Sequence, residues 1–277
     1  MNPKLSLIAA ILAVTVTSGC AVKHTDLETL ASAPGIKPEV VPSTPFPLQG
    51  MLPEAGDYDR LRVYIEGDGP STQNDPTPTN SLVARLAVED KRPSVYLARP
   101  CQFVQTEDCN PKLWNDKGIA PEVIASYVSA LNGLKARFNN TQFELIGNAD
   151  GGAIALLLAA ERDDVVGVQT IASNADTNAG DVSKPGSLNG STNTTEQAKR
   201  LSNIPQRHIV WSKETPAAGI ETPDYMTQLQ GKCTEIVEVQ VSYLESFEKP
   251  WKKLSGTPYA CLTKPVLRKP SVMVGSY

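Results

Sequence analysis

Histidine, aromatic residues and long apolar runs are all scarce in this chain. Among 277 residues only His24 and His208 are histidines, so any role that needs an imidazole must fall on one of two positions. The net charge is −4, and no basic stripe alternates with aromatic residues, which argues against a nucleic-acid partner. After the first twenty residues no apolar segment is long enough to span a bilayer. The remaining length suffices for one large globular domain or two small ones.

The cysteines lack the spacing of a metal or redox motif. No two of them have the C-x-x-C spacing, so the sequence predicts no metal site and no cofactor. Export of the chain would place the four cysteines after Cys20 in an oxidising compartment, where they can form two disulfides. Three pairings are arithmetically possible, and proximity in the sequence favours Cys101 with Cys109 and Cys233 with Cys261.

Residues 1–19 have the pattern of a secretory signal peptide. Lys4 precedes a short apolar run, and small residues then lead to Cys20. This arrangement resembles a bacterial lipoprotein signal, after which Cys20 is the first mature residue and carries fatty acyl chains such as palmitate. An ordinary signal with an incidental cysteine is the alternative. In such lipoproteins a residue other than aspartate after the cysteine, here Ala21, favours the outer membrane. The resemblance therefore implies a lipid-anchored envelope protein that faces the periplasm.

The rest of the chain divides into a tether, one domain and a tail. Residues 20–57 are rich in proline and show no helical or strand period, which predicts an extended tether. Residues 266–277 are expected to be a flexible tail. Between them, residues 58–265 alternate strand-like and helix-like segments, which predicts a single α/β domain with a mostly parallel sheet covered on both faces. The expected strands are 61–65, 94–98, 143–147, 165–172, 208–211 and 235–239, and the expected helices are 81–90, 121–138 and 150–162.

The segment 143–158 predicts a sharp turn from a strand into a helix. An apolar run meets Gly147, the chain passes Ala149 and Asp150, and an Ala/Leu-rich segment follows Gly151. Glycines on both sides of such a turn permit a sharp bend and a close approach of helix and strand. The frame is that of a nucleophile elbow, G-x-S-x-G, with alanine in the place of the serine. Because many strand–helix units carry Gly-x-x-x-Gly, an ordinary turn is the alternative.

Several short segments, in order along residues 60–255, resemble the α/β-hydrolase superfamily and, more closely, bacterial α/β-hydrolase-like lipoproteins. The resemblance implies the α/β-hydrolase fold. The segments that carry it are Tyr64–Gly69, Leu97–Gln102 with Cys109 and Trp114, Leu145–Gly147 with Gly151–Ala155, Gly186–Asn189, Pro205–His208, and Trp251.

The resemblance also implies positions for a catalytic triad, and two of the three are vacant. The nucleophile position falls on Ala149, whereas Glu214 stands where the acid is expected. The histidine should follow the strand 235–239, shortly before Trp251, and the sequence has none there. Neither His24, on the tether, nor His208, which opens a strand, can be the base in this topology. The resemblance therefore implies a degenerate triad.

An oxyanion hole consists of backbone N–H groups, so it can persist when the side chains of the triad are lost. The resemblance assigns these donors to Asp150 and to the turn Gly67-Asp68-Gly69. An aspartate nucleophile at Asp150 is the alternative, but such enzymes also need a histidine to activate water. Asp150 is better explained as a favourable charge in the first turn of its helix.

These observations favour a pseudoenzyme over an enzyme. Loss of the nucleophile or base of a triad costs about a million-fold in turnover. The expected function is therefore binding, either of a ligand in the inherited cleft or of another envelope protein, by a domain anchored through Cys20. One alternative is an active serine-hydrolase-type esterase or peptidase with a displaced catalytic group. Another is a structural lipoprotein with a filled cleft, which the small polar residues of 174–194 do not favour.

Overall fold

The computed structural model describes residues 27–30, 35–67, 75–79, 82–115, 119–173, 200–212, 233–240, 247–263 and 271–274. Within these residues nine strands form one sheet in the order β1-β2-β4-β3-β5-β6-β7-β8-β9. β2 is antiparallel to β1 and β4, and all other neighbours are parallel. The strands are β1 (Ile36–Val41), β2 (Leu48–Pro53), β3 (Arg60–Ile65), β4 (Ser94–Leu97), β5 (Gln142–Asn148), β6 (Val165–Ser173), β7 (Gln206–Ser212), β8 (Thr234–Gln240) and β9 (Ser271–Val274).

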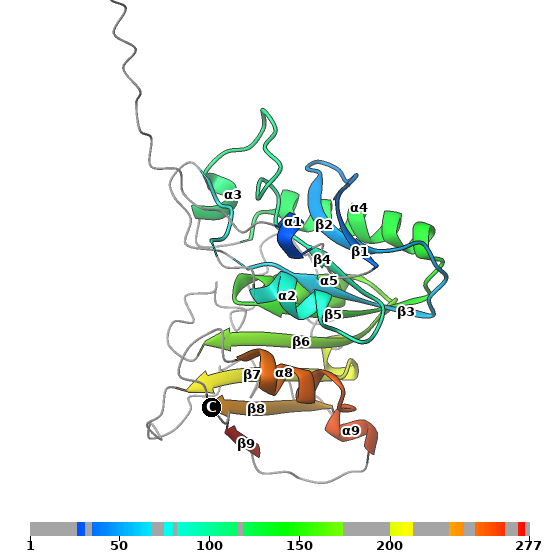
Figure 1. Cartoon of the computed structure of the whole chain (residues 1–277), viewed down its shortest axis with the longest axis vertical. Coiled ribbons are helices and arrows are strands. Elements are labelled where there is room, and N and C mark those ends of the chain that lie inside the picture. Colours follow the sequence, from blue (N-terminus) through cyan, green and yellow to red (C-terminus); the bar gives the residue numbers. More distant parts are fainter. Residues whose placement is uncertain are drawn as a thin grey trace, which may run out of the picture.

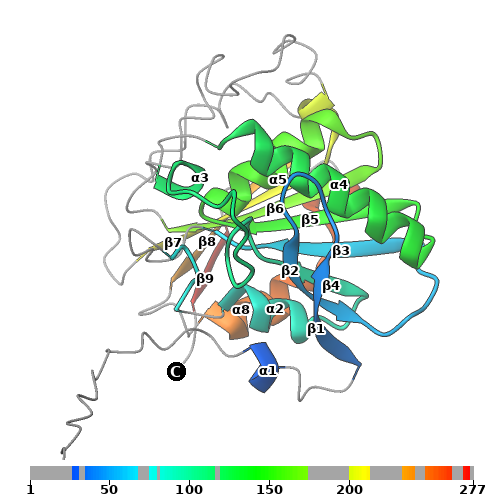
Figure 2. The same cartoon turned by 90° about the horizontal axis from the view of Figure 1, so that it is seen from above.

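Helices cover both faces of this sheet, as the sequence predicted (Figures 1 and 2). α4 and α5 lie on one face, whereas α2 and α8 lie on the other, with α1 beside α2. Each face has its own apolar core, one around Phe143 and Leu145 of β5 and one around Tyr64 and Trp251. The helices are α1 (Leu27–Leu30), α2 (Leu82–Val88), α3 (Lys112–Asn115), α4 (Pro121–Phe138), α5 (Asp150–Glu161), α8 (Glu248–Ser255) and α9 (Ala260–Thr263).

Helix α4 has the bounds that its sequence predicts. Pro121 occupies the first turn, where its missing N–H costs no hydrogen bond. Apolar side chains at helical spacing, including Tyr127 and Leu134, are buried against the sheet. The helix ends at Phe138, and the next residue, Asn139, has a φ of 50°, the left-handed conformation common at helix ends.

The expected tether over residues 20–57 is wrong for its second half. Residues 36–53 form the antiparallel pair β1–β2, and β2 continues into the sheet through β4. The prolines that indicated a tether are compatible with this arrangement, because Pro38 lies in β1, which pairs only with β2 and so forms an edge of the sheet. Apolar residues between the prolines, such as Leu48 and Met51, are fully buried. Their burial anchors the segment to the domain.

The expected flexible tail over 266–277 is also wrong in part. Residues 271–274 form β9, which pairs in parallel with β8. A short stretch with valines, such as Ser271–Val274, becomes a strand when it pairs with the edge of a sheet. The local sequence alone does not show that such an edge is nearby.

Arg62 on β3 is the centre of a buried ion cluster. It is 1 % exposed and donates to both carboxylate oxygens of Glu144 on β5, at 2.9 and 3.1 Å. It also donates to Asp90 at 2.7 Å and to the Ser255 carbonyl at 3.0 Å. Burial opposes the charge on Glu144, but the attraction of Arg62 and the hydrogen bonds from Arg62, Tyr259 and Gln169 together outweigh it and lower the pKa of that carboxyl.

Arg207 on β7 repeats this arrangement three strands further along the sheet. Its side chain is 2 % exposed and forms an ion pair with Glu235. It donates to the carbonyls of Leu254 at 2.9 Å and Pro258 at 2.9 Å. The last carbonyls of a helix lack intrahelical partners, and here the two arginines supply donors for the end of α8. The arginines thereby fix the C-terminal helices to the sheet.

Replacing Arg62 with methionine should lower the free energy of unfolding by about 3–5 kcal/mol, because two buried carboxylates lose their counter-charge. Urea denaturation of the purified protein measures this. The matched control is Arg137→Met, which breaks the half-exposed pair of Arg137 with Glu39 and should cost at most about 1 kcal/mol. Equal losses in the two variants would contradict a structural role for the buried cluster.

Candidate functional site

The turn between β5 and α5 has the backbone of a nucleophile elbow. Ala149 stands between the last residue of β5 and the first of α5, with φ 49° and ψ −123°. Few residues other than glycine adopt a positive φ, and in hydrolases of this type the elbow residue is strained in this way. The Ala149 N–H donates to the Ile171 carbonyl of β6 at 2.8 Å, and the Gly152 N–H donates to the Ala149 carbonyl at 2.9 Å.

Close backbone packing around Ala149 explains why the neighbouring positions are glycines. A Cβ atom on Gly147 would overlap the Gly151 carbonyl, and one on Gly151 would overlap the Ile65 carbonyl of β3. A Cβ atom on Gly67, which follows β3, would lie 2.5 Å from the Asn148 carbonyl oxygen. The ends of β3 and β5 and the start of α5 therefore touch through their backbones. Gly67 lies next to the elbow, where the oxyanion turn is expected.

A carboxylate holds the start of that turn. Glu66 is 5 % exposed; its Oε1 accepts from the Gly67 N–H at 3.1 Å, and its Oε2 accepts from the Tyr96 hydroxyl at 3.0 Å. Burial and the neighbouring Glu66 charge raise the pKa of Tyr96 well above its ordinary value, so this hydroxyl stays protonated and donates. The oxyanion role of Gly67 and Asp150 stays a prediction.

Arg99 and Gln102, which follow β4, connect this turn to the elbow. The sequence analysis gave these residues no role. Arg99 is 3 % exposed; its Nη1 lies 3.4 Å from Oδ2 of Asp150, and its Nη2 donates to the Leu113 carbonyl at 3.3 Å. Gln102, 1 % exposed, donates to the Gly67 and Pro76 carbonyls at 3.1 Å each and accepts from the Arg99 N–H. Their position at the carboxyl end of a central strand is the sequence signal that could have identified them.

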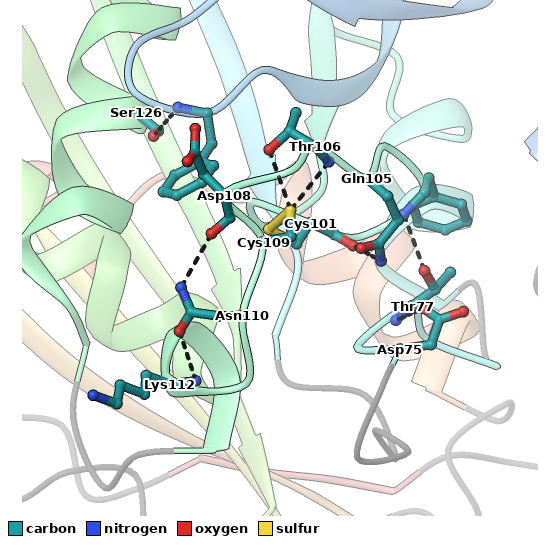
Figure 3. The surroundings of a disulfide bond; sticks show 12 residues. Asp75, Thr77, Cys101, Gln105, Thr106, Asp108, Cys109, Asn110, Lys112 and Ser126 are labelled. Atoms are coloured by element: carbon teal, nitrogen blue, oxygen red, sulfur yellow. Dashed lines mark hydrogen bonds between the residues drawn. A yellow bond between two sulfur atoms is a disulfide. The ribbon is translucent and has the colours of Figure 1, made fainter.

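The Cys101–Cys109 disulfide closes a loop that contains Gln102 and begins two residues after Arg99 (Figure 3). Both favoured pairings are present, with Cα–Cα distances of 5.8 Å for Cys101–Cys109 and 5.0 Å for Cys233–Cys261. The Cys109 sulfur accepts from the Thr106 N–H at 3.3 Å, and Gln105 donates to the Cys101 carbonyl at 2.8 Å. The disulfide loop therefore has its own internal bonds, and through Gln102 it supports the mouth of the site.

His208 lies inside the core rather than on the surface of the site. It is fully buried on β7, and its Nδ1 lies 2.8 Å from the Thr170 hydroxyl on β6. Burial lowers the pKa of His208 to about 4, so the ring is neutral at physiological pH. Thr170 is 6 % exposed and packs beneath Gly152 of α5, where an added Cβ would be 3.2 Å from the threonine Cβ. The imidazole and hydroxyl are hydrogen-bonded but covered.

Some predicted positions lie outside the residues that the structure describes. These are Cys20, Asp68, Gly69, Glu214 and the segment 174–194 that was expected over the elbow. Among the described residues, no group of three or more His, Cys, Asp or Glu side chains could hold a metal ion. In the same part of the chain, none of the helices has both the length and the apolar character needed to cross a bilayer.

The strand order, the antiparallel β2 and the elbow after β5 define an α/β-hydrolase fold. An esterase of Pyrococcus furiosus shares it at 12 % identity and a TM-score of 0.55, covering 84 % of this chain and 92 % of the esterase. A cold-adapted esterase from an Arctic intertidal metagenomic library, bound to PEG, gives 16 % identity and a TM-score of 0.50, covering 79 % and 92 %. At such identities the likeness shows the fold alone. No protein-family model matches the sequence, and no curated protein matches it either.

Replacing Ala149 with glycine should raise the free energy of unfolding by up to about 1 kcal/mol. Glycine relieves a positive φ that costs a non-glycine residue about 1–3 kcal/mol, and the relief exceeds the added entropy of the unfolded chain. Ala153→Gly, one turn into the same helix, is the control and should lower stability by about 1 kcal/mol. Thermal and urea unfolding of both variants measure this; a comparable loss in both would mean that Ala149 is unstrained.

Acid should destabilise the fold through His208. The pKa of His208 is about 4 in the folded protein and about 6.5 in the unfolded chain. Between these two pH values the ring is protonated in the unfolded chain and neutral in the folded protein. The free energy of unfolding should therefore fall by about 3 kcal/mol as pH drops from 7 to 4. In the variant His208→Gln this part of the pH dependence should vanish. Urea unfolding at each pH measures this. If the free energy of unfolding changes with pH by the same slope in wild type and variant, His208 is not a buried neutral ring.

Proposed function

We propose that this chain is a lipid-anchored envelope protein that uses a catalytically degenerate α/β-hydrolase fold for binding. One observation carries the proposal: the elbow backbone is intact, but its apex is Ala149, which has no nucleophilic atom. A scaffold that retains a strained turn without the serine it serves has kept the shape of the site and not its reaction. Shape and backbone donors suffice to bind a ligand or another envelope protein.

The histidines support the same proposal. A triad base must reach the nucleophile at hydrogen-bond distance. His208 is buried with its Nδ1 against Thr170, and the only other histidine is His24, four residues after the proposed anchor. The region before Trp251, where the triad histidine is expected, contains none. The base is therefore missing independently of the serine.

The proposed location follows from the N-terminal sequence. Lipid on Cys20, followed by Ala21, would hold the domain at the outer membrane, facing the periplasm. The two disulfides fit an oxidising compartment of this kind. The anchor would make the membrane the permanent partner, with the ligand or envelope protein as the second.

An active esterase or peptidase with a displaced catalytic group is the second candidate. Thr170 and His208 favour it, because a hydroxyl 2.8 Å from an imidazole is the pairing that activates a nucleophile. Their burial opposes it, since Thr170 is 6 % exposed and covered by α5. Substrate would need α5 to move.

A fluorophosphonate probe, followed by intact mass, separates the two functions. The wild type and Ala149→Ser should both remain unlabelled and should not hydrolyse esters, because a restored serine still lacks a base. Labelling of the wild type that disappears in Thr170→Val would establish the displaced-nucleophile enzyme. Labelling of Ala149→Ser alone would show that a base reaches the elbow after all, and the degenerate-site proposal would fail.

A further inference from the structure

Helix α1 brings the start of the domain onto one particular face. Leu27 is 7 % exposed and belongs to the apolar cluster that α2 and α8 form with the sheet. Figure 2 shows α1 beside α2, on the face of the sheet opposite to α4 and α5. The polypeptide therefore leaves the domain from the surface made by α1, α2 and α8, which we call the α8 face.

The position of Leu27 limits the distance between this face and the lipid. The seven residue steps from Cys20 to Leu27 span at most about 25 Å when fully extended. A tether of residues 20–57 would have allowed the domain to turn freely above the bilayer. With β1 and β2 in the sheet and α1 docked, the α8 face must stay near the membrane surface.

This face carries positive charge on a chain that is negative overall. α1 and the segments 82–93 and 248–255 contain six basic and four acidic residues, whereas the net charge of the chain is −4. Three of the four acids are already paired with an arginine or lysine of the protein. The pairs are Arg85–Glu248, Lys252–Glu89 and Arg62–Asp90.

Three lysines of the α8 face remain available to an external anion. Lys91, Lys249 and Lys253 are exposed, and none forms an ion pair with another described residue. Lys249 and Lys253 are four residues apart on α8 and so project from the same side. The apolar side of α8, with Trp251 and Leu254, is buried inward. Among the described residues, the exposed large apolar side chains are Val40 and Leu262, and neither lies in α1, α2 or α8. The face thus offers charge to a surface rather than exposed large apolar side chains.

We propose that the α8 face lies against the anionic lipid surface of the membrane that holds Cys20. The proposal rests on the lipid anchor of the proposed function. The anchor keeps the domain close to the membrane, and the lysines determine which face turns toward it. Each basic residue near an anionic membrane surface increases the affinity about fivefold. In this orientation the carboxyl edge of the sheet, with the elbow and the disulfide loop, points sideways along the membrane and stays open to the periplasm.

Vesicle binding of a chain that begins at Ala21 tests the surface without the anchor. This chain lacks the signal and the lipid but retains every described residue, so all described contacts are kept. It should sediment with vesicles of equal parts phosphatidylglycerol and phosphatidylcholine, should release as salt increases, and should not bind pure phosphatidylcholine.

Two triple variants of equal net charge locate the binding surface. Lys91→Gln, Lys249→Gln and Lys253→Gln together should weaken binding about 100-fold. Lys112→Gln, Lys135→Gln and Arg137→Gln together, on α3 and α4 away from the α8 face, should leave it within about threefold. Equal losses in the two variants, or equal binding to neutral vesicles, would overturn the proposal.

The mass of the mature full chain from a bacterial envelope tests the anchor separately. A mass that includes acyl chains on Cys20, together with the lysine dependence above, supports both proposals. An unlipidated chain whose Ala21 form still binds anionic vesicles would refute the anchor but retain the α8 face as a membrane surface. A lipidated chain whose lysines have no effect would refute the face alone.

Discussion

The direct packing of backbone on backbone at the carboxyl edge of the sheet is the constraint on which the site depends. The chain at Gly67, Gly147 and Gly151 approaches so closely that no Cβ fits at these positions. This contact, with the hydrogen bond from Ala149 to Ile171, fixes the strained conformation of the apex. A serine side chain plays no part in either interaction, which explains how the elbow persists without it. The reaction and the scaffold are physically separable, and this chain has the scaffold.

Polar side chains hold the surrounding loops and the helix α8 to the sheet at its two opposite edges. At the carboxyl edge, Arg99 and Gln102 link Asp150, the Gly67 turn and the disulfide loop. Toward the amino ends of the same strands, Arg62 and Arg207 bind the carbonyls that end α8. Burying a charge is costly unless it is fully paired, and each of these side chains has several partners. These arginines therefore have no charge left over for an external ligand, unlike the exposed lysines of the α8 face.

Periodicity predicted the interior of the fold well and its margins poorly. β5, α5, β6 and α4 were readable because an apolar run or a helical stripe reports burial within a single segment. β1 and β2 were missed because proline usually argues against a strand, and an edge position such as that of Pro38 removes the argument. The elbow turn was found from its glycines. Arg99 and Gln102 were not assigned a role: their place after a strand was visible in the sequence, but their partners lie 51 and 35 residues away and meet them only in the folded sheet.

The sequence by itself determined that alanine occupies the apex of the elbow and that histidine is scarce, since both are facts of composition and order. It also determined the α/β pattern, because burial imposes a period on neighbouring residues. Only the tertiary structure decided that His208 is a neutral core residue, that α1 and the strands β1 and β2 pack on the domain and that three lysines share one exposed face. Burial and proximity between distant segments depend on how the sheet and helices pack together, and no local stretch of sequence encodes them separately.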